Sequence, residues 1–281
     1  MTRILTVLPY VNPPHETIEL YKAKIIKMTE AEYFDASRNS IMHSATPPEM
    51  MRIALARQGQ TVPHDYKEIF KHNVLKNGDE IGSFEWAVLE TEAASPSADC
   101  YLAVFELLGG SWRSLVRDNA FMEQSPLVLV PMPRTPKEIS LHTINPEDIE
   151  GLYDASKLLA ESLRFQISLR SWWYSFMRRE DTADIIVSCC QALEAIFVIN
   201  QELRLCLALY TYHYLGGLNK KILANVFELY GLRSGIVHGS KLVKANDTKA
   251  YIEIVGDVLS KVLQDKKLPN SKELDMRIGI R

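Results

Sequence analysis

Proline is nearly absent from the second half of the chain, and this constrains the fold more than any other feature. Of the 13 prolines, only Pro269 follows Pro146. A proline inside a helix removes a backbone hydrogen bond and clashes with the preceding turn, so a proline-poor stretch with helical spacing of apolar residues indicates uninterrupted helices. We expect about five helices, followed by a tail. They cover residues 148–179, 181–200, 201–215, 219–239 and 247–264.

The first half has a different pattern. Short apolar stretches rich in β-branched and aromatic residues alternate there with clusters of Pro, Gly and Asn, which is typical of strands and turns. Strands are predicted at 18–28, 81–91, 100–108 and 127–130, and helical spacing occurs at 47–59 and 64–78. Residues 131–146 hold four prolines and are the expected linker. We therefore predict an α+β domain over 1–145 and an all-α helical bundle over 146–281.

Composition agrees with two folded domains. The chain has 281 residues, 47% of them hydrophobic and 24% charged, as in ordinary soluble globular proteins. Its net charge of -3 argues against a protein that coats nucleic acid along its whole length. The charge is uneven, however: Lys and Arg number 14 against 21 acids up to residue 150, and 18 against 14 beyond it. The helical half is the basic one.

Targeting and metal signals are weak throughout. No apolar run reaches the ~18 residues of a transmembrane helix, and the first residues do not resemble a signal peptide. The four cysteines form no C-x-x-C pair, and the seven histidines do not fall at metal-ligand spacing beside a cysteine. We expect a cytoplasmic protein without a membrane segment, whose cysteines are small core residues and which uses no metal and no cofactor.

A basic and aromatic run lies in the first predicted helix of the bundle. Such a run suits nucleic-acid contact, but a long amphipathic helix with a solvated Arg face and a Trp-filled core face has the same pattern, and we favour the second interpretation. The run comprises Arg164, Arg170, Arg178 and Arg179, interleaved with Phe165, Trp172, Trp173 and Tyr174.

The segment NKKILANVFELYGLRSGIVHG, residues 219–239, is the most informative of the chain. Asn219 is placed to cap this helix, and Leu218 and Leu223 have the spacing of a hydrophobic staple. Apolar residues at helical steps then define the face that packs against the bundle. These residues are Ile222, Val226, Leu229 and Ile236.

Arg233 and His238 lie near the end of this helix. Arg233 falls on the packed face, where a guanidinium needs a partner or a ligand. His238 is five residues further on, roughly 140° around an ideal helix. An Arg that binds phosphate and a His that moves protons suit metal-independent phosphodiester chemistry. The structural alternative is an Arg paired with a buried acid and a His that caps the last turn before Gly239.

Glu194 is the one acid between Asp184 and Glu202, within the apolar segment VSCCQALEAIFVI. An ionised carboxylate in such a segment is costly without a partner. One hypothesis is that Glu194 pairs with Arg233 or orients His238. The alternative is an exposed position on the helix surface.

The residues LYGLRSGIVHGS, preceded by CCQALEAIF and SLRFQISLRSWW, resemble the Apea-like branch of the HEPN superfamily over about residues 150–265. Members of this superfamily are helical domains, usually dimers, and many are metal-independent endoribonucleases with an R-x(4-6)-H motif. Spacing alone is not specific, because Arg38 and His43 also match it. The resemblance depends on the helical context and on the sequence around Arg233. Ser234 stands where other HEPN branches have Asn, Asp or His.

The resemblance implies an activity and a set of site residues. Arg233 would hold the scissile phosphate, His238 would act as general base or acid while the RNA 2′-hydroxyl attacks, and Ser234 would donate a hydrogen bond to the phosphate. The product would be a 2′,3′-cyclic phosphate, formed in a cleft shared by a homodimer. The expected role is a phage-defence effector or a toxin, in which residues 1–145 sense a trigger or regulate the site and a further protein regulator is a candidate partner.

Two other functions compete with this one. The helical domain could be a non-catalytic dimeric HEPN module that regulates or binds RNA, and Ser234 favours this alternative. The first half could itself be an enzyme, but it lacks G-x-G-x-x-G, P-loop, G-x-S-x-G and H-E-x-x-H motifs.

Overall fold

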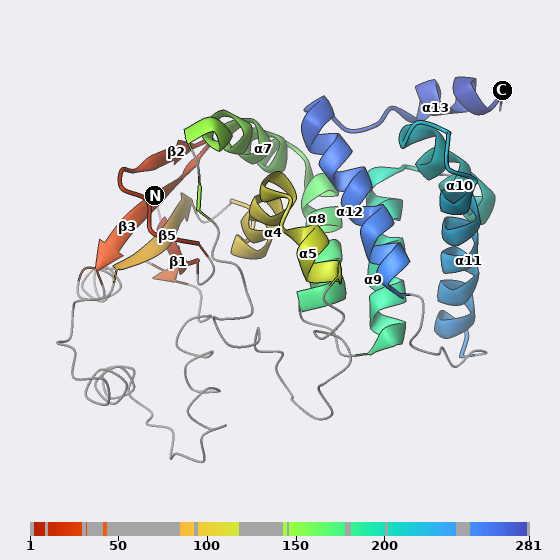
Figure 1. Cartoon of the computed structure of the whole chain (residues 1–281), viewed down its shortest axis with the longest axis horizontal. Coiled ribbons are helices and arrows are strands. Elements are labelled where there is room, and N and C mark those ends of the chain that lie inside the picture. Colours follow the sequence, from red (N-terminus) through yellow and green to blue (C-terminus); the bar gives the residue numbers. More distant parts are fainter. Residues whose placement is uncertain are drawn as a thin grey trace, which may run out of the picture. The chain divides into compact units, whose positions relative to one another are not determined.

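The computed structural model of the chain describes two compact units (Figure 1). The described residues are 3–8, 11–29, 32, 42–43, 85–92, 95–117, 143–144, 146–177, 181–199, 202–239 and 248–279. The first unit lies within Met1–Ala98 and Met132–Lys157, and the second within Asp99–Pro131 and Leu158–Arg281. This grouping differs from the expected boundary at 145/146, because it assigns Asp99–Pro131 to the helical unit and Met132–Lys157 to the first unit. The predicted helices at 47–59 and 64–78, the predicted strand at 127–130 and most of the predicted linker lie outside the described residues.

The first unit is built on a sheet with the order β2-β3-β5-β1-β4. Neighbouring strands pair antiparallel, except that β1 and β4 pair parallel. The segment 18–28, predicted as one strand, is extended but forms two strands of a hairpin, because the chain turns at Lys22, whose φ is 59°. The strand predicted at 81–91 is confirmed from Glu85 onward, and β1 was not predicted. The strands are β1 (Arg3–Val7), β2 (Ile18–Leu20), β3 (Ala23–Thr29), β4 (Met42–His43) and β5 (Glu85–Glu92).

One face of the sheet combines a small apolar cluster with an ion-pair network. Leu5, Val7 and Val88 are buried in the cluster, because cross-strand partners of an antiparallel pair project to the same face. The Glu90 carboxylate pairs with Arg3 at 3.0 Å and with Lys24 at 3.4 Å. The cations of two flanking strands thus neutralise an acid in the central one.

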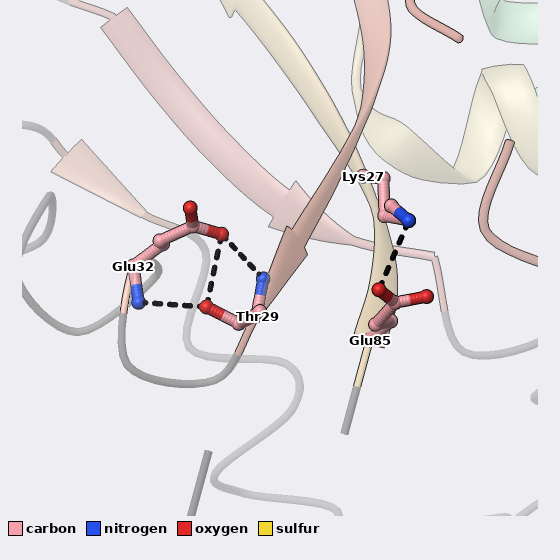
Figure 2. Close-up of polar contacts among 4 residues, drawn as sticks. All are labelled: Lys27, Thr29, Glu32 and Glu85. Carbon is pink, nitrogen blue, oxygen red and sulfur yellow. Dashed lines mark hydrogen bonds and ion pairs between the residues drawn. The ribbon is translucent and has the colours of Figure 1, made fainter. Parts of the chain in front are cut away.

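The end of β3 carries a capping box (Figure 2). The Thr29 backbone N–H donates to Glu32 Oε2 at 2.7 Å, and the Glu32 N–H donates back to Thr29 Oγ1 at 3.3 Å. This reciprocal pattern satisfies the backbone donors of Thr29 and Glu32, and Glu32 itself is helical. Beside it, Lys27 and Glu85 form an ion pair at 2.9 Å between β3 and β5.

The second unit is helical, and the described chain agrees with an α+β region followed by helices. The predicted strand at 100–108 is wrong: these residues belong to a helix whose central residues are buried on all sides. The predicted helix at 148–179 is two helices, because Ser162 starts a new one with its Oγ accepting from the Phe165 N–H at 3.2 Å. The expected C-terminal tail contains a further helix, capped by Asn270 and ended by Gly279 at φ 72°.

Most of the described chain after Ser97 is helical. The described residues form α4 (Ala98–Gly109), α5 (Trp112–Arg117) and the 3-10 turn η1 (Pro146–Asp148). Helix α7 (Ile149–Glu161) follows, and its residues up to Lys157 belong to the first unit. The second unit continues with α8 (Leu163–Met177), α9 (Thr182–Ile196), α10 (Leu203–Tyr214), α11 (Lys220–Val237), α12 (Thr248–Asp265) and α13 (Ser271–Ile278).

Within this unit α8 packs against α9, α10 packs against α11, and α9 also contacts α11 and α12. The aromatic side chains of the basic and aromatic run fill the core: Phe165 and Trp172 are fully buried, and Trp172 Nε1 donates to the Ile252 carbonyl at 3.1 Å. The amphipathic-helix interpretation is therefore confirmed for these residues. No helix in the described part of the chain combines the length and the apolar character needed to cross a membrane.

Candidate functional site at the end of helix α11

Helix α11 begins where the sequence predicted. Asn219 has an extended backbone, and its side-chain oxygen accepts from the Lys221 N–H at 3.0 Å, which is an N-cap. The predicted staple between Leu218 and Leu223 is wrong, because Leu218 is 92% exposed. Two successive glycines with positive φ, Gly216 and Gly217, turn the chain just before Leu218 and leave its side chain in solvent.

The predicted packing face of α11 is tightest in its middle. Val226 and Leu229 are completely buried, whereas Ile222 and Ile236 are half-buried at the two ends. Arg233 is half-buried as well, so the sequence placed it on the correct side of the helix. The guanidinium is directed toward α9, where it meets an acid.

Arg233 and Glu194 form the ion pair that the isolated acid in α9 suggested. Arg233 Nη2 lies 3.9 Å from Glu194 Oε2, and the two side chains are 32% and 29% exposed. The guanidinium also lies 5.7 Å from the centre of the Tyr230 ring, one helical turn earlier. A distance of 3.9 Å is too long for a hydrogen bond, so this carboxylate attracts Arg233 without using its N–H donors.

The surroundings of this pair are apolar toward the core. Cys190 lies one turn before Glu194, and burial raises the pKa of its thiol; the Glu194 carboxylate raises it further, while the Arg233 guanidinium lowers it. Cys190 is therefore a neutral thiol beside the pair. The Arg233 side chain stays 32% exposed, so solvent or a ligand can reach it.

Arg164 of α8 fixes the end of α9 next to Glu194. Its Nε donates to the Ala195 carbonyl at 3.1 Å, and Nη2 donates to the Ile196 carbonyl. A cation at a helix C-terminus satisfies carbonyls that lack partners and complements the helix dipole. Arg164 is thus a capping residue that positions the helix carrying Glu194, a role that its sequence context did not reveal.

His238 and Ser234 are linked through the backbone at the C-terminus of α11. The His238 N–H donates to the Ser234 carbonyl at 3.1 Å, and Gly239 follows with φ 67° and donates to the Ile236 carbonyl at 3.0 Å. The His238 side chain is exposed, and Ser234 is half-buried. The structure therefore joins Arg233 to Glu194. It shows no hydrogen bond or ion pair between the described side chains of Arg233 and His238.

Neither Tyr230, which lies beside Arg233, nor Arg164, which supports the helix that carries Glu194, was predicted from the sequence. The spacing Y-x-x-R was visible, because residues three apart on a helix are neighbours. Arg164 contacts carbonyls of another helix, and no local pattern indicates such a contact. Among the described residues, no group of three or more His, Cys, Asp or Glu side chains is arranged to hold a metal ion.

Comparisons with known proteins leave the site to be judged on its geometry. Neither a protein-family model, nor a curated protein, nor a solved structure matches this chain.

Proposed function

We propose that the protein is a metal-independent endoribonuclease of the HEPN type. Arg233 binds the scissile phosphate, and His238 takes the proton from the RNA 2′-hydroxyl or returns one to the leaving 5′-oxygen. The 2′-oxygen forms a bond to phosphorus as the bond to the 5′-oxygen breaks, which gives a 2′,3′-cyclic phosphate and a 5′-hydroxyl. Ser234 donates a hydrogen bond to the same phosphate.

The observation that supports this proposal is the environment of the Arg233 side chain. The side chain is half-buried, held near Glu194 and Tyr230, and its contact with Glu194 is 3.9 Å long. Charge-assisted hydrogen bonds to a phosphate are about 1.1 Å shorter than that, at about 2.8 Å, so a phosphate would compete well for the guanidinium. An exposed His near the same helix end supplies an imidazole, the side chain that most often serves as a general acid or base.

The separation of Arg233 and His238 supports a site made from two copies of the chain. Five residues place them roughly 140° apart around a helix, so one α11 presents them on different sides. In a homodimer formed through the helical unit, two copies of α11 would lie at one cleft, and Arg233 of one copy would face His238 of the other. A strict monomer in light scattering would contradict this arrangement.

The test uses purified full-length protein and both structured and single-stranded RNA in excess EDTA. We expect cleavage that survives the chelator and falls at least about 100-fold in Arg233→Ala and in His238→Ala, because general acid–base catalysis contributes about 100- to 10,000-fold. Arg277→Ala, which removes an exposed cation of α13, is the matched control and should cleave normally. Cleavage that is lost in EDTA, or retained in His238→Ala, would contradict the proposal.

Glu194 is a positioning residue in this proposal. Glu194→Gln removes the charge that holds Arg233 and should raise KM more than it lowers kcat, since the phosphate contact is weakened and the proton transfer is not. If both stability and RNA cleavage are unchanged in this variant, Glu194 does not position Arg233.

A second candidate function is a non-catalytic dimeric HEPN module that regulates or binds RNA. Ser234 and the occupied surroundings of Arg233 favour it, because an Arg paired with Glu194 and a His at a helix C-cap also meet purely structural needs. RNA binding without cleavage, and no growth arrest when the protein is expressed, would favour this function. Growth arrest that requires His238 would instead favour a defence effector or toxin regulated by residues 1–145.

A further inference from the structure

A second arginine is fixed on the outer surface of α11. Arg204, near the start of α10, lies over the ring of Phe227 with its guanidinium carbon 3.8 Å from the ring centre. Its Nε donates to the Phe227 carbonyl at 2.9 Å. Phe227 is 40% exposed and Arg204 is exposed, so this stacked pair faces solvent rather than the core.

Gly231 makes room for this arginine. A Cβ atom at Gly231 would lie 2.8 Å from Arg204 Nη2 and 3.2 Å from Cζ, closer than such atoms approach. Apart from proline, glycine is the poorest helix former, yet Gly231 stands inside α11. The missing side chain lets the guanidinium lie flat against the helix.

The donors of Arg204 are only partly used. Nε donates to the Phe227 carbonyl, and among the described residues no ion pair of the Arg204 guanidinium with an Asp or Glu is found. Nη2 lies above Gly231, and the Arg204 residue is exposed. An arginine that is stacked, fixed at Nε and free at Nη is pre-organised for an anion, and guanidinium planes also stack on nucleic-acid bases.

This pair shares a side of α11 with the end that carries His238. Phe227, Gly231, Ser234 and His238 follow at steps of four, three and four residues, and 11 residues amount to about three helical turns, or about 16 Å. A strand of a few nucleotides spans that length. The helix thus offers a cation and an aromatic ring at one end of a line and His238 at the other.

We propose that Arg204 and Phe227 form a subsite for single-stranded RNA beside the cleaved bond. A base stacks on the Arg204 guanidinium, Phe227 supports it from below, and the Nη groups bind a backbone phosphate. The subsite rests on the proposed ribonuclease function for its substrate class. It adds a contact a few nucleotides away from the phosphate that is cleaved.

The binding test uses a fluorescent single-stranded RNA with 2′-O-methyl groups, which cannot be cleaved by attack of a 2′-hydroxyl. Fluorescence anisotropy is measured over a salt series. Arg204→Gln should weaken binding about tenfold and reduce the slope of log affinity against log salt by about 0.7, since one phosphate contact is lost. Phe227→Leu should weaken binding without changing the slope, and Arg204→Lys should keep the slope but lose affinity.

Gly231→Ala is the most informative variant, because its added methyl group displaces Arg204 while alanine favours the helix. It should weaken RNA binding like Arg204→Gln, with an unchanged or raised thermal midpoint. Arg277→Gln, which removes an exposed arginine of α13, is the control for charge and should bind normally.

The outcomes separate this inference from the ribonuclease proposal. If unmodified RNA is cleaved and KM is unchanged in Arg204→Gln and Gly231→Ala, the subsite is overturned and the ribonuclease stands. If no RNA is cleaved but Arg204 and Gly231 still govern binding of the 2′-O-methyl strand, the subsite stands and the ribonuclease fails. Absence of binding by the wild type overturns the subsite. So does a dimer that dissociates in Gly231→Ala while RNA binding is unchanged, because Arg204 would then serve a protein contact.

Discussion

Arg164 shows how one side chain supports a site without belonging to it. Burial lowers its pKa, but an arginine remains charged in proteins, so its two bonds to the carbonyls at the end of α9 are charge-assisted. Those bonds fix the turn that also carries Glu194. Loss of Arg164 would therefore loosen Glu194 and, through it, Arg233.

We expect Arg164→Met to lower the free energy of unfolding by about 1.5 to 3 kcal/mol, the usual range for hydrogen bonds made by a charged group. Methionine keeps most of the aliphatic stem and removes the donors. Urea denaturation gives the free energy, and Arg170→Met, which removes an exposed arginine of the same helix, should change it by less than about 0.5 kcal/mol. Equal effects in the two variants would show that the cap contributes nothing.

For single residues, the sequence predicts contacts that offset the free-energy cost of burying a charge. An acid alone in an apolar run needs a cation, and an arginine on a packed face needs an acid, so the pairing of Glu194 with Arg233 was one hypothesis that the sequence offered, beside an exposed position for Glu194. The stack of Arg204 on Phe227 could not be predicted, because it joins two helices and depends on an absent side chain at Gly231. No periodicity in one segment encodes it.

The N-cap of α11 is a property of the element rather than of the site. Asn219→Ala should cost about 1 kcal/mol, because the Lys221 N–H loses its side-chain acceptor. Leu218→Ala next to it should be nearly neutral, since Leu218 is 92% exposed. Thermal unfolding of both variants measures the difference. A larger loss in Leu218→Ala would mean that Leu218 packs against something after all.

Two helical glycines give opposite predictions for the same substitution. A Cβ at Gly256 of α12 would lie 2.6 Å from the ring of Trp112, a buried side chain that cannot move aside. Gly256→Ala should therefore destabilise the helical unit by about 1 to 3 kcal/mol through overpacking. Gly231→Ala displaces only the far end of an exposed arginine and should not. Chemical denaturation of the two variants tests this contrast, and similar losses would contradict it.

Helix α4 explains where prediction of elements failed. Its residues Cys100 to Leu107 are all buried, so the segment shows no polar face and no period that distinguishes a helix from a strand. Its aromatic and β-branched content favoured a strand. The amphipathic helices α11 and α12 were predicted closely, because each has one buried face and one exposed face.

At the scale of the whole molecule, the helical unit should lose stability in alkali. Burial raises the pKa of Tyr101 to about 12. Burial raises the pKa of Tyr210 and Tyr214 as well, and their contacts with Asp275 and Asp265 add to it. The native state thus holds these protons more tightly than the unfolded state does. Stability is complete below the ordinary tyrosine pKa of about 10 and falls as pH rises through the native values.

The first unit, which holds the sheet, should instead lose stability in acid. Hydrogen bonds from the Thr29 backbone N–H and hydroxyl lower the pKa of Glu32, so the stabilising effect of its ionised form is present above about pH 4.3, the ordinary value, and is lost as pH falls through the native one. Circular dichroism of wild type and Glu32→Gln against pH measures the acid effect. Tyrosinate absorbance followed against pH measures the alkaline effect of the preceding paragraph. Titration of all tyrosines near pH 10 would contradict the alkaline prediction.

The four cysteines have a consequence for chemical labelling. All four are free and buried, and burial raises the pKa of Cys189, Cys190 and Cys206. Alkylating reagents attack the thiolate, so the folded protein should react slowly at its own thiols. A cysteine introduced at the exposed position of Leu218 would then be the fast-reacting one. A spin label or fluorophore attached there would test the proposed homodimer by reporting the distance between two copies of α11, without removal of any native cysteine.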